Sequence, residues 1–358
     1  MRRVFVGVLL VSALIAGGLY WKRDDVALFI FKHAVDRGLA MNTAATLPDG
    51  LSAAFCGTGS PIPDRTRAEP CLLVVAGRHI FVFDAGDGAA ETINQMGFNS
   101  TDIEAVFLTH FHSDHIDGLG ALALQHWVQR AATTPLSLYG GEGVERIANG
   151  FNEAYALDST YRTAHHGPAL APPSGFGYLA RPFAMPPGQQ SAVIYTNTDG
   201  VKITAFPVDH GPVHPAFGYR VDYAGRSITI SGDTAPTPNL IAMAQNTDLL
   251  VHDTLSPPMV NMIADSAAAH GQPGLTKIMH DIQSYHATPA QAADDAKAAH
   301  ARALALTHMV PPLPIQIMEG PFLGDARARF TGPLWVMRDG DIISLPRSGG
   351  MTKIHVLR

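Results

Sequence analysis

Two kinds of hydrophobic pattern alternate along most of the chain. Short apolar runs bounded by turn-forming residues, typical of strands, recur between residues 51 and 346. Longer stretches with apolar residues at helical spacing, at 87–97, 117–129 and 142–152, separate several of these runs. We therefore expect an α/β protein in which helices cover sheets. The predicted strands are 51–56, 71–76, 80–85, 104–110, 136–140, 201–208, 216–223, 226–231, 248–252 and 303–307, followed by a predicted hairpin over 334–346 that turns at Asp339-Gly340.

Two further segments have patterns of their own. Residues 153–190 are rich in Gly, Pro and aromatic residues and show little periodicity, which predicts a long excursion over the surface. The segment TPAQAADDAKAAHA begins with Thr288, a favoured N-cap residue, and Pro289 follows at the first turn. A helix is therefore expected to begin at Pro289.

The N-terminus combines basic flanks with a long apolar run. Arg2 and Arg3 precede the run from Val4 to Tyr20, which approaches the ~20 residues that a membrane span needs. We predict a membrane anchor over 1–23, with a cleaved signal peptide and a secreted product as the alternative. Residues 24–50 are expected to form an amphipathic helix and a linker, and residues 51–358 the main domain. That domain is expected to be periplasmic or extracellular.

Composition and charge narrow the functional class. The 358 residues are 46% hydrophobic and 16% charged, which suits one large globular domain. The net charge is -6 and no Lys/Arg-rich run is present, so the electrostatic footprint of a nucleic-acid-binding protein is missing. A homodimer is compatible with the sequence. Cys56 and Cys71 either pair in an oxidising compartment or are two small buried hydrophobic residues.

The segment FLTHFHSDHIDGLG concentrates four metal-binding side chains. His110, His112, Asp114 and His115 lie within six positions, between a predicted buried strand and a predicted helix. Side chains two apart on an extended chain point to the same side, so two imidazoles can reach one ion. Imidazole suits Zn²⁺, and a carboxylate oxygen completes a mixed site. The segment therefore predicts a metal centre.

These residues carry a resemblance to a known family. His110-Phe111-His112-Ser113-Asp114-His115 resembles the His-x-His-x-Asp-His motif of metallo-β-lactamase-fold hydrolases. Five more segments are similar, in the same order, to the ribonuclease Z and arylsulfatase-like branch: FCGTGSPIPDRTRAEPCLLV, FVFDAGDG, VDHGPVHPAFGYR, ISGDT and LALTHMVPP. The resemblance implies an αββα sandwich, in which two mixed β-sheets pack face to face with helices on both outer sides.

The resemblance also implies a set of ligands for two divalent ions, with zinc as the first choice. Between two such ions a water loses a proton near neutral pH, and Asp114 with the full ligand set favours ester hydrolysis. His214 is a rival to His210 in its segment. The implied set is His110, His112 and His210 for one ion, Asp114, His115 and His308 for the other, Asp233 between them and Asp84 in support behind the ligands.

Two other segments suggest proton transfer. VHDT and YHATP resemble paired segments of ribonuclease Z relatives, in which a His donates a proton to the leaving group and an acid orients it. Here His286 would be the donor and Asp253 the orienting acid, although that branch usually has Glu where Asp253 stands. The alternative is that His286 only caps the following helix. His165 and His166 are expected to line the substrate mouth, with a plain polar loop as the alternative.

The predicted function is hydrolysis of a small-molecule phosphodiester or sulfate ester by a dinuclear metal centre. Typical bacterial ribonuclease Z carries a long arm for tRNA between its Gly-Tyr-Arg and Ser-Gly-Asp segments, whereas FGYRVDYAGRSITISGDT joins them by a short hairpin. Three alternatives stay open: a ribonuclease Z-type tRNA 3′-end endonuclease, a lactonase, and a non-catalytic membrane-tethered metal-binding module.

Overall fold

The computed structural model describes residues 21–357. They divide into two compact units, and the boundary along the sequence falls between Thr43 and Ala44. The apolar run from Val4 to Tyr20, predicted to be a membrane anchor, lies outside the described residues. Within residues 21–357, no helix combines the length and the apolar character needed to cross a membrane. In the first unit, the predicted helix is present as α2 (Arg23–Ala40), and none of its side chains is buried.

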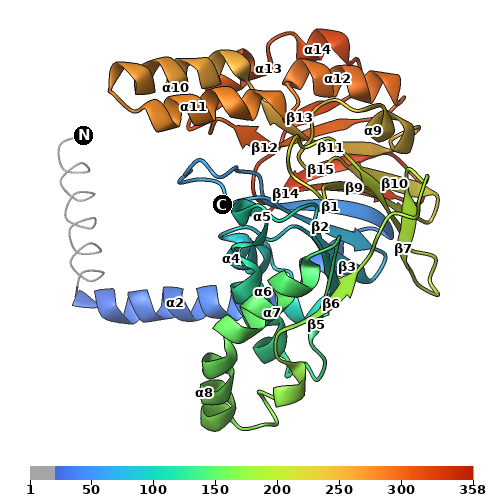
Figure 1. Ribbon diagram of the computed structural model, residues 1–358. Coiled ribbons are helices and arrows are strands. Elements are labelled where there is room, and N and C mark those ends of the chain that lie inside the picture. The colour runs from blue at the N-terminus through green and yellow to red at the C-terminus, as the bar shows by residue number, and fades with distance from the viewer. Residues whose placement is uncertain (1–20, 358) are drawn as a thin grey trace, which may run out of the picture. The chain divides into compact units, whose positions relative to one another are not determined.

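The second unit contains two mixed sheets that lie face to face (Figure 1). Parallel and antiparallel neighbours occur in both sheets. The first sheet has the order β15 (Thr352–His355), β14 (Asp341–Pro346), β1 (Gly50–Gly57), β2 (Cys71–Ala76), β3 (His79–Phe83), β4 (Ile103–Phe107), β5 (Leu136–Gly140) and β6 (Tyr178–Pro182). The second has the order β13 (Leu334–Val336), β12 (Leu304–Val310), β11 (Leu249–Leu255), β10 (Arg226–Ile230), β9 (Phe217–Tyr223), β8 (Lys202–Pro207) and β7 (Ala192–Thr196).

The main hydrophobic core lies between the two sheets, and central strands such as β1, β2 and β3 are buried on both faces. Along β1, Leu51, Ala53 and Phe55 join this core, while Ala54 and Cys56 point to the opposite side and join a second core under the helices. Burial on both sides explains why β1 has a continuous apolar run and no polar alternation. The predicted αββα sandwich is therefore confirmed.

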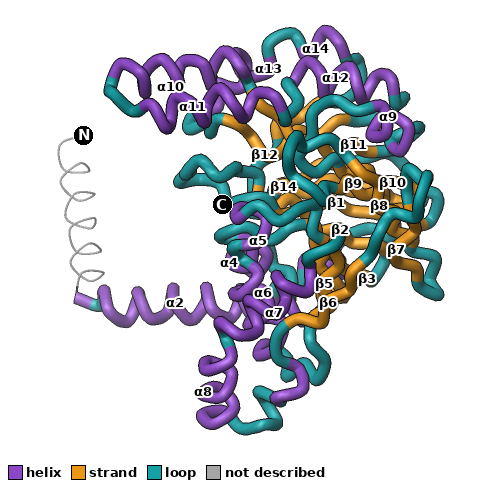
Figure 2. The backbone as a smooth tube through the Cα atoms, viewed as in Figure 1, coloured by secondary structure: helices purple, strands orange, loops and turns teal. Residues whose placement is uncertain are grey.

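Helices cover both outer faces (Figure 2). Apolar side chains of α4, α6 and α7 pack on the first sheet, and those of α9, α12, α13 and α14 pack on the second. The helices of this unit are α3 (Thr43–Thr46), α4 (Ala89–Gln95), α5 (Ser113–Ile116), α6 (Leu119–Gln129), α7 (Val144–Ala154), α8 (Ala156–His166), α9 (Pro238–Met243), α10 (Pro257–Ala269), α11 (Pro273–Asp281), α12 (Pro289–Ala298), α13 (Glu319–Leu323) and α14 (Ala326–Arg329).

Two predictions about local structure are wrong. Residues 334–346 do not form a hairpin, because β13 belongs to one sheet and β14 to the other. The turn between them crosses the sandwich, and Asp339 anchors it by accepting hydrogen bonds from the backbone N–H and the hydroxyl of Thr58 at 2.9 and 2.6 Å. Residues 153–190 are not only a long excursion over the surface, since they contain the whole of α8 and the whole of β6.

The two cysteines form a disulfide. Cys56 near the end of β1 and Cys71 at the start of β2 are bonded, with their Cα atoms 5.0 Å apart and 15 positions apart in sequence. The bond closes the loop that begins with the Gly-rich segment. The first of the two alternatives left open by the sequence therefore holds.

Candidate metal centre

The predicted site residues lie at the carboxyl ends of strands in both sheets. β3, β4 and β5 run parallel, and so do β10, β11, β12 and β13. The carboxyl ends of parallel strands meet at one edge of a sheet, where loops can carry polar side chains together. The side chains come from the end of β3 (Asp84), the loop after β4 (His110, His112), α5 (Asp114, His115), the loop after β8 (His210), the loop after β10 (Asp233) and β12 itself (His308).

Three imidazoles form the first ligand group, which consists of His110, His112 and His210. His110 Nε2 lies 2.9 Å from His112 Nδ1, and His210 Nε2 lies 3.3 Å from the same atom. The far nitrogens are fixed by other partners: His110 Nδ1 lies 3.0 Å from the hydroxyl of Thr109, and His210 Nδ1–H donates to the carbonyl oxygen of Tyr285 at 3.1 Å. The Nε2 lone pairs of His110 and His210 can therefore face the same ion.

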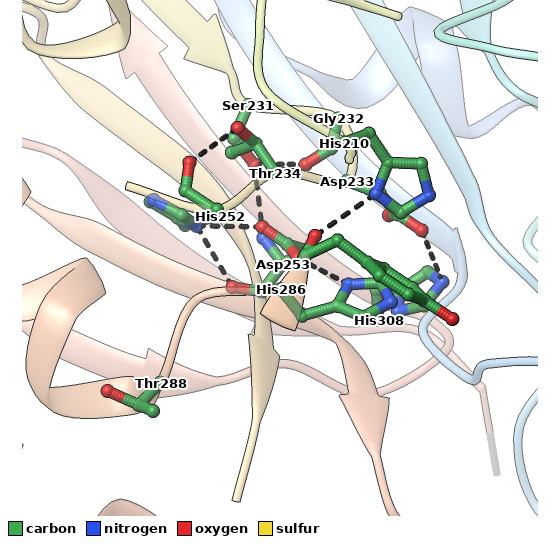
Figure 3. A network of polar contacts seen from close by, with 12 residues as sticks. His210, Ser231, Gly232, Asp233, Thr234, His252, Asp253, His286, Thr288 and His308 are labelled. Atoms are coloured by element: carbon green, nitrogen blue, oxygen red, sulfur yellow. Dashed lines mark hydrogen bonds and ion pairs between the residues drawn. The ribbon is translucent and has the colours of Figure 1, made fainter. Parts of the chain in front are cut away.

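The second ligand group consists of Asp114, His115 and His308. Asp114 Oδ2 lies 3.5 Å from His115 Nε2 and 3.3 Å from His308 Nε2. Asp233 Oδ2 lies 3.3 Å from His115, 3.1 Å from His308 and 4.0 Å from His110 Nε2. The carboxylate of Asp233 therefore reaches toward histidines of both groups, and His210 and His308 lie beside it in Figure 3.

The donor atoms fit divalent metal ions. His115 Nε2 is buried and has no hydrogen-bond partner among the described residues, although carboxylates surround it. In the first group, imidazole nitrogens crowd together without an acid between them. Nitrogen and carboxylate oxygen donors at such spacing are what Zn²⁺ and similar ions bind. Only His112 is exposed, so the centre opens to solvent on that side.

The pKa shifts differ between the two ligand groups. Burial acts to raise the pKa of Asp233, but the charges of His308 and His115 overcome it and hold that pKa well below its usual value. Burial acts to lower the pKa of His308, yet Asp233 and Asp114 raise it to about 10. In the first group, burial and the charge of His115 hold the pKa of His110 well below its ordinary value.

Asp84 lies outside the two ligand groups and orients His115 and Thr109. Its Oδ1 accepts the backbone N–H of Thr109 at 2.8 Å, and its Oδ2 accepts the Thr109 hydroxyl and His115 Nδ1–H, each at 2.8 Å. This fixes the His115 tautomer with Nε2 directed at the cluster. The approach of this strand end to α5 requires glycine, because a Cβ on Gly118 would lie 2.1 Å from the carbonyl oxygen of Gly86.

Left-handed backbone recurs at this site. Asp84 has φ 57° and His308 has φ 47°, conformations that residues other than Gly adopt infrequently. His308 sits at an irregularity in the pairing of β11 with β12, where Asp253 pairs with Thr307 but Thr254 pairs with Met309. Such a bulge re-aims a side chain, and here it directs His308 toward Asp114 in the second ligand group. Strain of this kind is typical of functional sites.

His286 lies against the cluster and pairs with Asp253. His286 Nδ1–H donates to Asp253 Oδ2 at 2.9 Å, and both side chains are buried. One ring nitrogen of His286 lies within 4.8 Å of ligand atoms of His210 and Asp233. Asp reaches His286 in spite of being one methylene shorter than Glu. The following helix is capped by Thr288 in a capping box with Gln291, so His286 is free of the cap.

Comparisons with known proteins identify the family. The sequence model of the Beta-lactamase superfamily domain matches residues 79–309. A protein of Mycobacterium bovis (strain BCG / Pasteur 1173P2) named ribonuclease Z is 34% identical over 267 residues, which cover 74% of this chain and 87% of that relative. The chain belongs to the metallo-β-lactamase superfamily. It is a hydrolase of the ribonuclease Z branch, as the motifs indicated.

Solved structures support the same fold. Human tRNase Z, short form, is 22% identical with a TM-score of 0.59, and the match covers 82% of this chain and 99% of that one. The metallo-beta-lactamase fold protein YhfI from Bacillus subtilis is 18% identical with the same TM-score and the same coverage. At this identity the likeness shows the architecture alone.

Some of the predicted site residues are not brought to the centre. His165 and His166 are exposed at the end of α8, which lies well away from α5 in Figure 1. The sequence suggested that these histidines lie in a loop over the substrate mouth, but they lie at the end of α8. Of the two rival histidines, His210 joins the first ligand group, while His214 belongs to no group of metal-binding atoms among the described residues.

Three residues near the metallo-β-lactamase site were missed from the sequence. Thr109 contacts both Asp84 and His110. It was missed because it precedes the first histidine and so lies outside the motif. His252 lies beside Asp253 and contacts its carboxylate, and Asp295 on α12 faces His252. Their signal was a charged or polar residue in an otherwise apolar segment: His252 within LLVHDTL, and Asp295 on the alanine-rich buried face of α12.

Proposed function

We propose that this hydrolase is a metal-dependent phosphodiesterase with chemistry of the ribonuclease Z type. The observation that carries the proposal is the convergence of seven nitrogen and carboxylate donors with the His286–Asp253 pair at one opening. A phosphodiester suits such a centre, because both the attacking and the departing oxygen carry charge in the transition state. Zinc is the first metal to test, because imidazoles dominate the donor set.

The ligand groups divide the work of holding two ions. The first group would hold one ion through three imidazoles, the second would hold the other through Asp114, His115 and His308, and Asp233 would serve both. When bound, the ions lower the pKa of a water and offset the negative charge that develops on the phosphoryl oxygens. Asp84 keeps His115 in the tautomer that ligation requires, and the buried walls exclude bulk water.

The chain's own acid acts on the leaving group. An oxygen from water forms a bond to phosphorus and gives up a proton to solvent, while the bond from phosphorus to the ester oxygen breaks. That ester oxygen needs a proton, and His286 is positioned to donate one from the nitrogen that Asp253 does not hold. Asp253 accepts the Nδ1–H of His286, which fixes the orientation of the ring.

The relatives' names support an RNA phosphodiester better than the small ester expected from the sequence. The mycobacterial relative named ribonuclease Z aligns over most of its length. We therefore propose processing at an RNA 3′ end as the first substrate class to test. Cleavage there breaks the same kind of bond and uses the same acid.

A small phosphodiester is the second candidate, supported by three observations on this chain. β9 and β10 are joined by the turn at Ala224-Gly225, which leaves no room for a tRNA-binding arm at that point. The net charge is -6 and no Lys/Arg-rich run is present, so the protein offers a polyanion little electrostatic attraction. The third observation is the disulfide.

The disulfide supports our proposal that the domain works outside the cytoplasm. Disulfides persist in oxidising compartments and are rare in the cytosol. Together with the apolar N-terminal run, the Cys56–Cys71 bond favours a periplasmic or extracellular domain, where precursor tRNA is absent. The two substrate classes therefore require different locations: an RNA substrate requires the cytoplasm, whereas a small phosphodiester is compatible with a domain outside it.

A parallel assay separates the candidates. Zinc-loaded protein is given precursor tRNA, bis-p-nitrophenyl phosphate, p-nitrophenyl sulfate and an acyl-homoserine lactone, with His110→Ala as the matched control. Cleavage of precursor tRNA as the dominant activity supports the RNA substrate, and dominant diester turnover supports the small one. Dominant sulfate or lactone hydrolysis contradicts the phosphodiesterase proposal. Bound metal with no turnover of any ester favours the non-catalytic module.

A further inference from the structure

The carboxylate of Asp253 is held from two sides. Its Oδ2 accepts His286 Nδ1–H at 2.9 Å, and its Oδ1 lies 3.1 Å from His252 Nδ1 (Figure 3). The backbone N–H of Asp253 donates to the hydroxyl of Ser231 at 3.1 Å. A carboxylate contacted at both oxygens cannot rotate without breaking one of the contacts. His252 therefore helps to fix the orientation that serves His286, and its Nδ1 also lies 2.9 Å from the backbone carbonyl oxygen of Asp253.

His252 is in turn held by a second acid. Its Nε2 lies 3.5 Å from Asp295 Oδ2 on α12. Both atoms are buried, and neither has a hydrogen-bond partner among the described residues, so the ion pair is what offsets their burial. Burial acts to lower the pKa of His252, but the hydrogen bond to Asp253 and the negative charges of Asp253 and Asp295 overcome it and raise the pKa to about 10. His252 is thus an imidazolium with a carboxylate at each nitrogen.

The same contacts join β11 to the segment that carries His286. α12 begins two residues after Ala287, and the backbone N–H of Leu255 donates to the carbonyl oxygen of Ala287 at 2.8 Å. Asp295 lies on the buried face of α12 and reaches back to His252 on β11. The side chain of Asp253 has fewer rotatable bonds than Glu and cannot adjust its carboxylate as freely. The contacts that orient this carboxylate therefore matter more than they would for Glu.

We propose that His252 and Asp295 are positioning residues that hold Asp253 in the orientation required for proton donation by His286. Neither touches substrate or metal ligands. The chain of contacts runs from Asp295 through His252 and Asp253 to His286. This inference rests on the proposed function, because it concerns the acid of that same reaction.

The test compares leaving groups. Bis-p-nitrophenyl phosphate releases p-nitrophenol, which departs readily as an anion, whereas diphenyl phosphate releases phenol, which depends more on protonation. General acids contribute about 10²- to 10⁴-fold to rate, and loss of orientation should forfeit part of that. For Asp295→Asn and His252→Gln we expect kcat on diphenyl phosphate to fall about 10-fold or more, with a much smaller loss on the nitrophenyl ester.

Controls separate positioning from stability. Asp294→Asn changes the neighbouring exposed acid, which pairs with Arg329, and should leave both rates unchanged. A merely structural role for His252 and Asp295 would lower stability and leave the ratio of the two rates unchanged, and that result would overturn the inference. Should His252→Gln fail to fold, Asp295→Asn carries the same expectation, since it preserves the shape of the side chain.

A spectroscopic readout works without turnover. In the zinc-loaded full chain, the buried N–H protons of His252 and His286 should give low-field proton resonances, assigned through the variants His252→Gln and His286→Gln. Asp295→Asn is expected to shift both the His252 and the His286 signals, because the contacts are in series. A His286 signal that is unmoved contradicts the inference. Absence of ester turnover by the unaltered protein, with the coupled shifts present, contradicts only the proposed function.

Discussion

Replacing Asp84 with Asn tests how the metal centre is held. Oδ1 of this side chain faces a backbone N–H of Thr109, which can only donate, so the carbonyl oxygen of Asn must take that position. The amide NH₂ then replaces Oδ2 and faces His115 Nδ1. It donates to that nitrogen and shifts the His115 proton to Nε2, the atom directed at the second ligand group. The tautomer is then wrong for ligation.

The size of the effect follows from these contacts. Loss of a partner that orients a metal-binding histidine typically costs about 10- to 100-fold in affinity, which corresponds to about 1.4 to 2.7 kcal/mol. We expect the upper part of this range, because Asp84 is only 5% exposed and water has little access to replace the lost acceptor. The other contacts of Asp84 survive, since Asn can still accept from the backbone and donate to the hydroxyl of Thr109.

Zinc affinity is measured by competition with a chromophoric chelator, and circular dichroism checks that the fold is intact. Asp102→Asn is the matched control, since it removes one exposed carboxylate that pairs with Arg130 far from any ligand. We expect one of two zinc ions to bind more weakly in Asp84→Asn and neither to change in Asp102→Asn. Unaltered affinity for both ions in a folded Asp84→Asn protein would refute the role assigned to this acid.

Three further outcomes are expected. Replacing Cys56 and Cys71 together with Ala should lower the free energy of unfolding in urea by about 3 kcal/mol, because the bond closes a loop between residues 15 apart; a loss below about 1 kcal/mol would contradict this. The raised pKa of His252, about 10 against an ordinary 6.5, means that its stabilising contribution is complete below pH 6.5 and disappears as the pH rises through about 10. The destabilisation by His252→Gln, measured by urea unfolding of the metal-free protein, should therefore be larger at pH 6 than at pH 10. Removing metal with a chelator should lower the melting temperature, and zinc at about 100 times its dissociation constant should restore about 2.7 kcal/mol; a melting temperature indifferent to both additions would argue against a metal site.

Much of the architecture could be predicted because it is encoded locally. The strand that becomes β4, the motif after it and the helix start at Pro289 each depend on neighbouring residues, and all three predictions agree with the structure. The helices α10 and α11 were missed, although each has a Pro in its first turn. The pattern over 334–346 fits a hairpin equally well whether or not its two strands share a sheet, so local information was insufficient there.

The sequence by itself determined the family, the order of the ligand segments and the chemistry of the donor types, because each is written in short contiguous motifs. Only the tertiary structure decided which side chains meet: that Cys56 bonds Cys71, that His210 and not His214 joins the first ligand group, and that His165 and His166 stay apart from it. The chain from Asp295 through His252 to Asp253 was likewise invisible beforehand. Contacts between segments far apart in sequence depend on the packing of sheets and helices, and no local pattern specifies the distance between two such side chains.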